Sequence, residues 1–171
     1  VIDRSIGNKS SEGTNLGNMG IIYKTLGEYD KAISLYQEAL NINRELEDKH
    51  SIGINQGNLG DLYYKVKRWR KAKEHLRLSV QIFDSIDSSL GKAVFQGSLA
   101  LILAQEDEID TAIELVREAE EPVTVHPFEN GKFLCKKAHV LHLANIKEEA
   151  VETLQQAIAI SVELKIKNNS E

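Results

Sequence analysis

The sequence is poor in the residues that punctuate or cross-link a chain. It has two prolines and one cysteine, Cys135, among 171 residues, and only 6% of its residues are aromatic. A single cysteine excludes an internal disulfide framework and is typical of a reducing compartment, so we expect a cytoplasmic protein. No apolar run is long enough to span a bilayer, and no signal-peptide pattern is present. The scarcity of proline favours helices over a fold of short strands and turns.

A repeat of about 40 residues runs through the chain. Residues 14–23 align with residues 54–63, and a second shift of 40 followed by one of 38 brings residues 97–119 and 138–157 into the same columns. The first shift superposes Gly17, Asn18, Gly20 and Tyr23 on Gly57, Asn58, Gly60 and Tyr63. Fixed periods of this size indicate repeat architectures.

The alignment divides the chain into four repeat units. It predicts units at residues 13–52, 53–92, 93–130 and 131–171, all in one domain, with the tail of an earlier unit at residues 1–12. Because the chain starts with Val1 and its first residues fit the end of a unit, we expect the parent protein to be longer.

Each unit is expected to form two antiparallel helices. In the first unit, apolar residues recur at helical spacing over residues 16–26 and 29–46, on either side of a short turn at Gly27 and Glu28. Glycine within a helix costs about 1 kcal/mol relative to alanine, so the repeated Gly20 and Gly60 indicate a close approach of paired helices. Small residues recur in these columns: Gly20, Gly60, Ala100 and Ala138, opposite Ala32, Ala72, Ala112 and Ala150.

These columns resemble the tetratricopeptide repeat (TPR). The resemblance is carried in the first unit by Met19-Gly20-x-x-Tyr23, Gly27-x-Tyr29-x-x-Ala32, Tyr36 and Ala39-Leu40, and in the second by Leu59-Gly60-x-x-Tyr63 and Trp69-x-x-Ala72. It implies an all-α fold, a right-handed α-α superhelix (solenoid) of stacked antiparallel helix pairs. The period of 40 rather than 34 is similar to that of kinesin-light-chain-like and LGN-like arrays.

The chain departs from the family pattern at two further places. The proline that often ends the second helix is missing, and Lys137 occupies a column held elsewhere by Met19, Leu59 and Leu99. Both prolines of the chain, Pro122 and Pro127, lie at the third junction instead. Because proline breaks a helix interior, the second helix of unit three should end near Glu121, shorter than its counterparts.

The resemblance implies a concave surface lined by one stripe of the first helices. Four lysines and one aspartate give this stripe a formal charge of +3 in a chain of net charge −5, which would attract an acidic or carboxylate-ended segment. The candidate peptide-binding residues along it are: Asn18, Lys24, Asn58, Asp61, Tyr64, Lys65, Ser98, Gln105, Lys132, Lys136, His139 and His142.

Asn18 and Asn58 are the strongest candidates within the stripe. A side-chain amide offers both a donor and an acceptor, so it can pair with the main chain of an extended peptide. The competing interpretation is that these two asparagines brace neighbouring helices. The carboxylate clamp of chaperone-binding members is incomplete, because Gly57 and Asp61 replace its lysine and asparagine, which argues against an adaptor for chaperone tails.

Catalytic and metal chemistry find little support. Cys135, His139 and His142 share one helix stripe, but no fourth ligand is evident, so we expect no metal and no cofactor. No phosphate-binding loop is present, because Gly17-x-x-Gly20 lacks the lysine-serine/threonine ending. The basic run at residues 65–73 could contact nucleic acid. However, Lys67 and Arg68 align with acidic residues of neighbouring turns, which favours contacts between repeats.

The sequence therefore predicts a non-enzymatic scaffold that binds a protein or an extended, acidic peptide through its concave groove, without nucleic acid or membrane. One alternative is a regulatory segment of a larger signalling protein, linked to a kinase or cyclase. Another is a self-association or spacer module.

Overall fold

The computed structural model describes residues 4–168, with side chains described for residues 8–165. Over this range the chain forms helices and no strand, and none of these helices is long and apolar enough to cross a membrane. The helices are α1 (Arg4–Leu26), α2 (Tyr29–Glu45), α3 (Lys49–Lys65), α4 (Trp69–Ser85), α5 (Ser89–Gln105), α6 (Ile109–Glu118), α7 (Glu120–Thr124), α8 (Pro127–Leu143) and α9 (Lys147–Asn168). The predicted all-α class is confirmed.

The helices follow the period of the sequence. Helices α3 and α5 start 40 residues apart, as do α2, α4 and α6, whereas α8 and α9 start 38 residues after α5 and α6. The unit starts expected at residues 53, 93 and 131 each lie four residues inside a helix. The helix starts thus agree with the period, the turns lie slightly earlier in the chain than the expected unit starts, and the division into units stays a prediction.

The first helix differs from the expectation for residues 1–12. Residues 4–12, expected to be the tail of an earlier unit, continue without a turn into the rest of α1, and residues 1–3 lie outside the described residues. Lys9 forms an ion pair of 2.8 Å with Glu45, so the first half of α1 lies along the end of α2. Both side chains are exposed, so solvent screens this pair and it adds little to stability.

The turns between helices share one backbone design. A residue with positive φ ends α1, α3 and α8 at Gly27 (80°), Lys67 (60°) and Asn145 (61°). The amide that follows each of these donates back to the helix, as when Arg68 N–H donates to the Tyr63 carbonyl at 2.8 Å. This is the Schellman geometry, which satisfies carbonyls that a helix end leaves unpaired. Glu47, Asp87 and Asp107 adopt the same conformation at three further turns.

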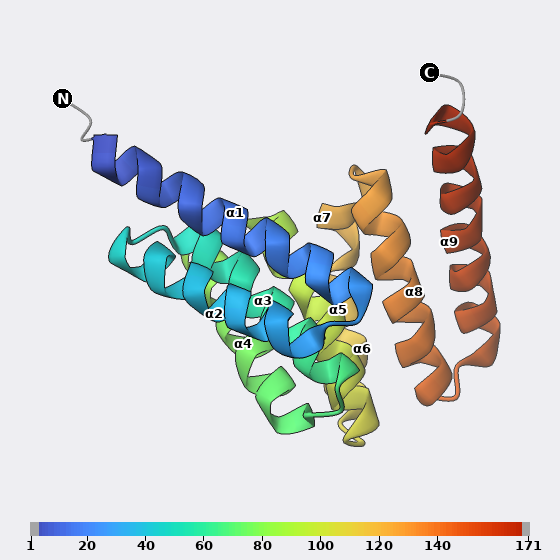
Figure 1. The fold of residues 1–171 in the computed structure, drawn as a ribbon. Coiled ribbons are helices and arrows are strands. Elements are labelled where there is room, and N and C mark those ends of the chain that lie inside the picture. The colour runs from blue at the N-terminus through green and yellow to red at the C-terminus, as the bar shows by residue number, and fades with distance from the viewer. Residues whose placement is uncertain (1–3, 169–171) are drawn as a thin grey trace. The chain divides into compact units, whose positions relative to one another are not determined.

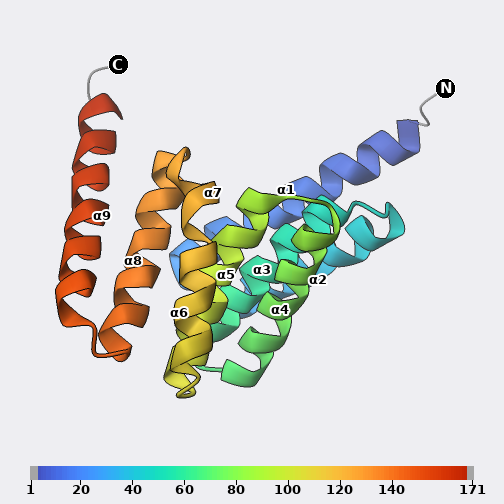
Figure 2. The ribbon, with the colours of Figure 1, turned by 180° about the vertical axis from the view of Figure 1, so that it is seen from behind.

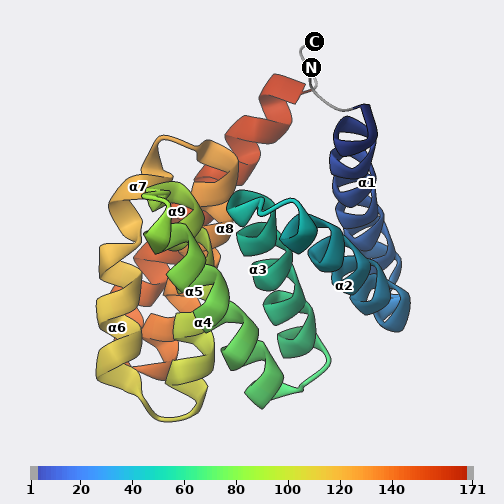
Figure 3. The same ribbon diagram turned by 90° about the vertical axis from the view of Figure 1, so that its left-hand side faces the viewer.

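The chain divides into two compact units, Val1–Gly91 and Lys92–Glu171. In the first, α1 packs on α2, α2 on α3 and α3 on α4, and consecutive helices run antiparallel (Figures 1 and 3). In the second, α8 packs against α6, the short α7 and α9, and Figure 2 shows α8 and α9 side by side. Helix α5 begins in the first unit and continues into the second.

Small residues bring the paired helices close together. Gly20 and Gly60 are buried, and Ala32 and Ala72 on the partner helices are fully buried. A Cβ atom on Gly60 would lie 2.5 Å from Leu76 Cγ and 3.1 Å from the Leu76 backbone nitrogen. A helix made with a larger residue here would have to move away from its partner, which supports the sequence interpretation of these glycines.

The third junction is shortened by proline. Helix α6 ends at Glu118, three residues before the expected Glu121, and α7 follows after Ala119. Pro122 lies in the first turn of α7 and Pro127 opens α8, positions where a missing N–H leaves no intrahelical bond unmade.

Lys137 is accommodated in its apolar column by an ion pair. Lys137 is only 8% exposed. Its Nζ atom lies 2.7 and 2.9 Å from the two carboxylate oxygens of Glu120 on α7. A carboxylate oxygen of Glu149 on α9 lies 3.8 Å away. One lysine therefore connects α8 to both neighbouring helices where other units have an apolar side chain.

We predict that Gly60→Ala destabilises the protein by up to about 2 kcal/mol. Overpacking against Leu76 typically costs about 1–3 kcal/mol, and the higher helix propensity of alanine offsets about 1 kcal/mol of it. Gly131→Ala is the matched control, because its Cβ would lie at an ordinary 3.5 Å from Ile160 Cγ2. It should stabilise by up to about 1 kcal/mol. Urea unfolding followed by circular dichroism measures both, and equal effects would contradict the close-approach interpretation.

We also predict that Glu120→Ala destabilises the protein by about 1–3 kcal/mol, because it leaves the Lys137 ammonium buried without its main partner. Lys137→Met restores the residue type that this column holds at Met19 and should be neutral or stabilising. The exposed neighbour Glu121 is the control, and Glu121→Ala should change stability by less than about 0.5 kcal/mol. A larger loss for Lys137→Met than for Glu120→Ala in thermal unfolding would refute this account.

Candidate functional site

The first unit contains a small hollow between α1, α2 and α3, which we call the asparagine hollow. Its volume is about 110 Å³. It brings together residues that lie up to 45 positions apart in the sequence. The lining residues are Gly13, Thr14, Gly17, Asn18, Ile21, Asn43, Ser51, Ile54, Asn55 and Asn58. Asn18 on α1 and Asn58 on α3, the two strongest candidates, thus lie on one surface feature.

Glycine leaves the room for this hollow. A Cβ atom on Gly13 would lie 2.6 Å from Asn43 Oδ1, and one on Gly17 would lie 3.2 Å from Asn55 Oδ1. Larger side chains at these positions of α1 would therefore press on the asparagines that form the floor and wall.

The four asparagines differ in exposure and in their partners. Asn18 is exposed and Asn58 is half-buried, so both amides can meet a ligand. Asn55 is 4% exposed, and its Nδ2 donates to the Ser51 carbonyl at 3.0 Å. Asn43 is 2% exposed, and its Nδ2 has no hydrogen-bond partner among the described residues.

Sequence reasoning did not identify Asn43 or Asn55 as site residues. A signal for Asn55 was present, because Asn15 occupies the same column one repeat earlier. A signal for Asn43 was also present, because its column holds Phe83 and Val123 in the second and third units. The fourth unit has Ser161 in this column, but it is exposed, so Asn43 is the buried polar residue of the column.

The remaining candidates of the first unit lie outside the hollow. Lys24 and Asp61 are half-buried. Tyr64 packs edge-on against Trp69 with ring centroids 5.1 Å apart, and the Lys65 ammonium lies 5.6 Å from the centroid of the Tyr29 ring. Tyr64 and Lys65 thus help to join helices while they remain at the surface.

Burial together with the Asp61 carboxylate raises the pKa of the Tyr36 hydroxyl to about 12. This phenol lies inside the first helix pair and stays protonated at any physiological pH. It therefore offers no titratable group to the groove.

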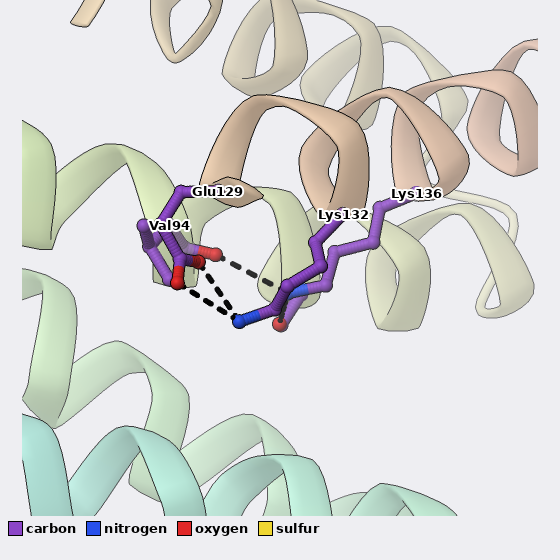
Figure 4. Close-up of polar contacts among 5 residues, drawn as sticks. Val94, Glu129, Lys132 and Lys136 are labelled. Carbon is purple, nitrogen blue, oxygen red and sulfur yellow. Dashed lines mark hydrogen bonds and ion pairs between the residues drawn. The ribbon is translucent and has the colours of Figure 1, made fainter. Parts of the chain in front are cut away.

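In the second unit the same stripe is bridged by the chain's own side chains. Lys136 Nζ donates to Ser98 Oγ at 2.5 Å and to the Val94 carbonyl at 3.3 Å. Lys132 Nζ pairs with both Glu129 carboxylate oxygens, at 2.9 and 3.0 Å, as Figure 4 shows. Ser98 is buried beneath this contact. The two lysines expected to attract an acidic ligand are thus already engaged, and the column of Asn18 and Asn58 is closed at Ser98 and Lys136.

The last candidates lie on α8 and at the end of α5. His139 and His142 are exposed and line, with Cys135 and Leu154, an open hollow of about 410 Å³ between α8 and α9. Gln105 is exposed at the end of α5. Within residues 4–168, no group of three or more histidine, cysteine, aspartate or glutamate side chains is arranged to hold a metal ion.

Helix α9 carries exposed apolar side chains in columns that are buried in the first unit. Leu154 and Ile158 are 46% and 56% exposed, although their columns hold Tyr36 and Leu40, which are buried in the first unit. In that unit α3 covers α2, whereas no helix within residues 4–168 follows α9. Phe128, 65% exposed, borders a further hollow of about 610 Å³ on the same helix pair.

Comparison with known proteins agrees with this geometry. The family model of the tetratricopeptide repeat matches residues 10–85. The crystal structure of BtubC (BKLC) from P. vanneervenii has a TM-score of 0.69 at 16% identity, over 90% of this chain and 64% of that one. A kinesin-light-chain-like protein of Podosopora anserina with nearly identical TPR-like repeats has a TM-score of 0.61 at 19% identity, over 89% of this chain and 76% of its own. No curated protein matches the chain significantly.

Antiparallel helix pairs that recur at a fixed period define a helical-repeat protein. The family model places tetratricopeptide repeats at residues 10–85, and the solved structures show that the fold over most of the chain is similar to that of proteins with TPR-like repeats. The solved structures share its fold at low identity, and the chain spans less than two thirds of the length of BtubC. Repeats of this family generally mediate contacts between proteins, and proteins built from them are generally not enzymes.

Proposed function

We propose that the protein is an interaction module whose first unit binds an extended polypeptide segment across α1 and α3. The observation that carries the proposal is the position of Asn18 and Asn58, which line one hollow from two successive first helices. Each amide can donate to a main-chain carbonyl and accept from a main-chain N–H of an extended chain.

The second unit gives less support for peptide contact. Because Lys136 is bonded to Ser98 and Val94, a ligand there would have to displace contacts that the chain already makes. We therefore confine the proposed groove to the first unit and treat Ser98, Lys132 and Lys136 as structural residues.

The proposed ligand is neutral or weakly acidic. Within the groove of the first unit, the formally charged candidates are Lys24, Lys65 and Asp61, a sum of +1 in place of the +3 of the whole stripe. Electrostatic attraction of an acidic segment is accordingly modest and should weaken further with added salt. The proposed setting is the cytoplasm, where the exposed free thiol of Cys135 would stay reduced.

We predict that Asn18→Ala and Asn58→Ala each weaken peptide binding about 3- to 10-fold, the usual effect of losing one hydrogen bond. Peptides would first be selected from a random displayed library on the wild-type chain. Dissociation constants for the selected peptides would then be measured by fluorescence anisotropy for the wild-type chain and each variant.

Asn15→Ala is the matched control, because Asn15 is an exposed asparagine of α1 that does not line the hollow. It should leave the affinity unchanged. Selected peptides that bind both groove variants as tightly as the wild type would remove the asparagines from the proposal. Failure to select any peptide above background would count against polypeptide binding by this unit.

A further inference from the structure

One column of the repeat holds a polar residue that is buried in the first unit, whereas its polar counterpart in the fourth unit, Ser161, is exposed. Asn43, Phe83 and Val123 occupy this column, and each is at most 2% exposed. A buried amide costs free energy unless its donors and acceptors are satisfied, so it is an unfavourable replacement for phenylalanine or valine on packing grounds alone.

The side chain of Asn43 leaves space that its counterpart fills. In the second helix pair the Phe83 ring packs against Gly53, where a Cβ would lie 2.9 Å from two ring carbons. In the first pair the shorter Asn43 lies against Gly13, and the asparagine hollow opens beside it. The hollow is thus the place of an aromatic ring that this unit lacks.

Asn43 also brings an unused donor to the hollow. Its Nδ2 is buried and has no hydrogen-bond partner within the described part of the chain, although the residue lines the hollow. Buried amides without a partner are rare in folded proteins, and a ligand atom that accepts this N–H would remove the penalty.

The lining of the hollow specifies the chemistry of that ligand. Its polar groups are the amides of four asparagines and the hydroxyls of Thr14 and Ser51, and no charged residue is among them. A carboxylate would lose its hydration without gaining a cationic partner, which is costly. A carboxamide is neutral and offers both a carbonyl oxygen and N–H groups to surrounding amides. At about 110 Å³ the hollow admits a group of only a few heavy atoms.

We propose that the asparagine hollow is a pocket for one neutral carboxamide, the side chain of an asparagine or glutamine in the bound polypeptide, whose carbonyl oxygen accepts from Asn43 Nδ2. This assignment rests on the proposed function, because it specifies which side chain of the bound polypeptide the groove recognises. Asn18 and Asn58 pair with the main chain, whereas Asn43 selects the side chain.

The test titrates the 171-residue chain with two small probes, N-acetyl-asparagine methylamide and its aspartate counterpart. Side-chain amide resonances of Asn43 in nitrogen-15 NMR spectra report on the pocket directly. The asparagine probe should shift these resonances in a saturable way, and the aspartate probe at neutral pH should not. Equal shifts with both probes, or a bound water at Asn43 with no response to either, would overturn the assignment.

Asn43→Val separates a binding role from a packing role. Valine already occupies this column at Val123, so the variant should fold with an unfolding midpoint no lower than that of the wild type. It should weaken the asparagine probe at least about tenfold, as followed by the Asn58 resonances. Asn41→Val, on the exposed face of the same helix, should bind the probe like the wild type. An Asn43→Val variant that keeps its probe affinity would refute the pocket.

The peptide selection distinguishes this inference from the proposed function. Selected peptides enriched in asparagine or glutamine at one position, and weakened by Asn43→Val, would support both. Peptides that depend on Asn18 and Asn58 but show no carboxamide preference would refute the carboxamide pocket. The proposal that α1 and α3 bind a polypeptide would still stand. If the asparagine probe binds in the hollow but no peptide is selected, polypeptide binding by the first unit would be refuted. The carboxamide pocket would still stand.

Discussion

The close contact between the two helices of each pair is the constraint on which the rest of the structure depends. Where α3 crosses α4, Gly60 leaves no space beside Leu76, and where α1 crosses α2, Gly20 faces the ring of Tyr36 at the same column. Backbones that touch in this way cannot rotate or slide without a clash. The turns reinforce the constraint, because the same Schellman geometry returns the chain after α1, α3 and α8. Residues of one repeat column therefore face the same neighbouring helix in each helix pair.

This fixed register explains why single substitutions in a column have local and readable effects. At the column of Asn43 the backbone does not adjust to fill the space of a missing ring, so a hollow forms beside α1. At the column of Met19, a lysine is held by carboxylates on the adjacent helices while the helix pair keeps its spacing. At the column of Asn18, Lys136 bridges to Ser98 and removes the groove that the asparagines leave open. Substitutions at single columns thus change the local packing and the groove, while the arrangement of the helix pairs stays the same.

The sequence was sufficient for the helix pairs, the period and the small residues at the crossings, because these follow from apolar spacing repeated in several units. It was also sufficient to place Asn18 and Asn58 on one surface, since their column lies on successive first helices. It did not reveal the floor of the hollow. Asn43 lies on a second helix, and its approach to Gly13 depends on how two helices pack, which periodicity does not specify. Nor could it show that Lys136 turns inward, because a long side chain can reach several partners.

The ion pair of Lys137 has a consequence for how the repeats find one another during folding. Units with the same columns can exchange places, and misassembly of this kind is a characteristic failure of repeat proteins. Helix α8 in the place of α3 or α5 would bury an ammonium group without Glu120 and Glu149, which lie beside it only in its own position. The Lys137 charge therefore distinguishes the helix pair that contains α8 from the other pairs and makes an arrangement with exchanged helices less stable. A residue that adds little to the stability of the native chain can in this way help to determine which chain topology is reached.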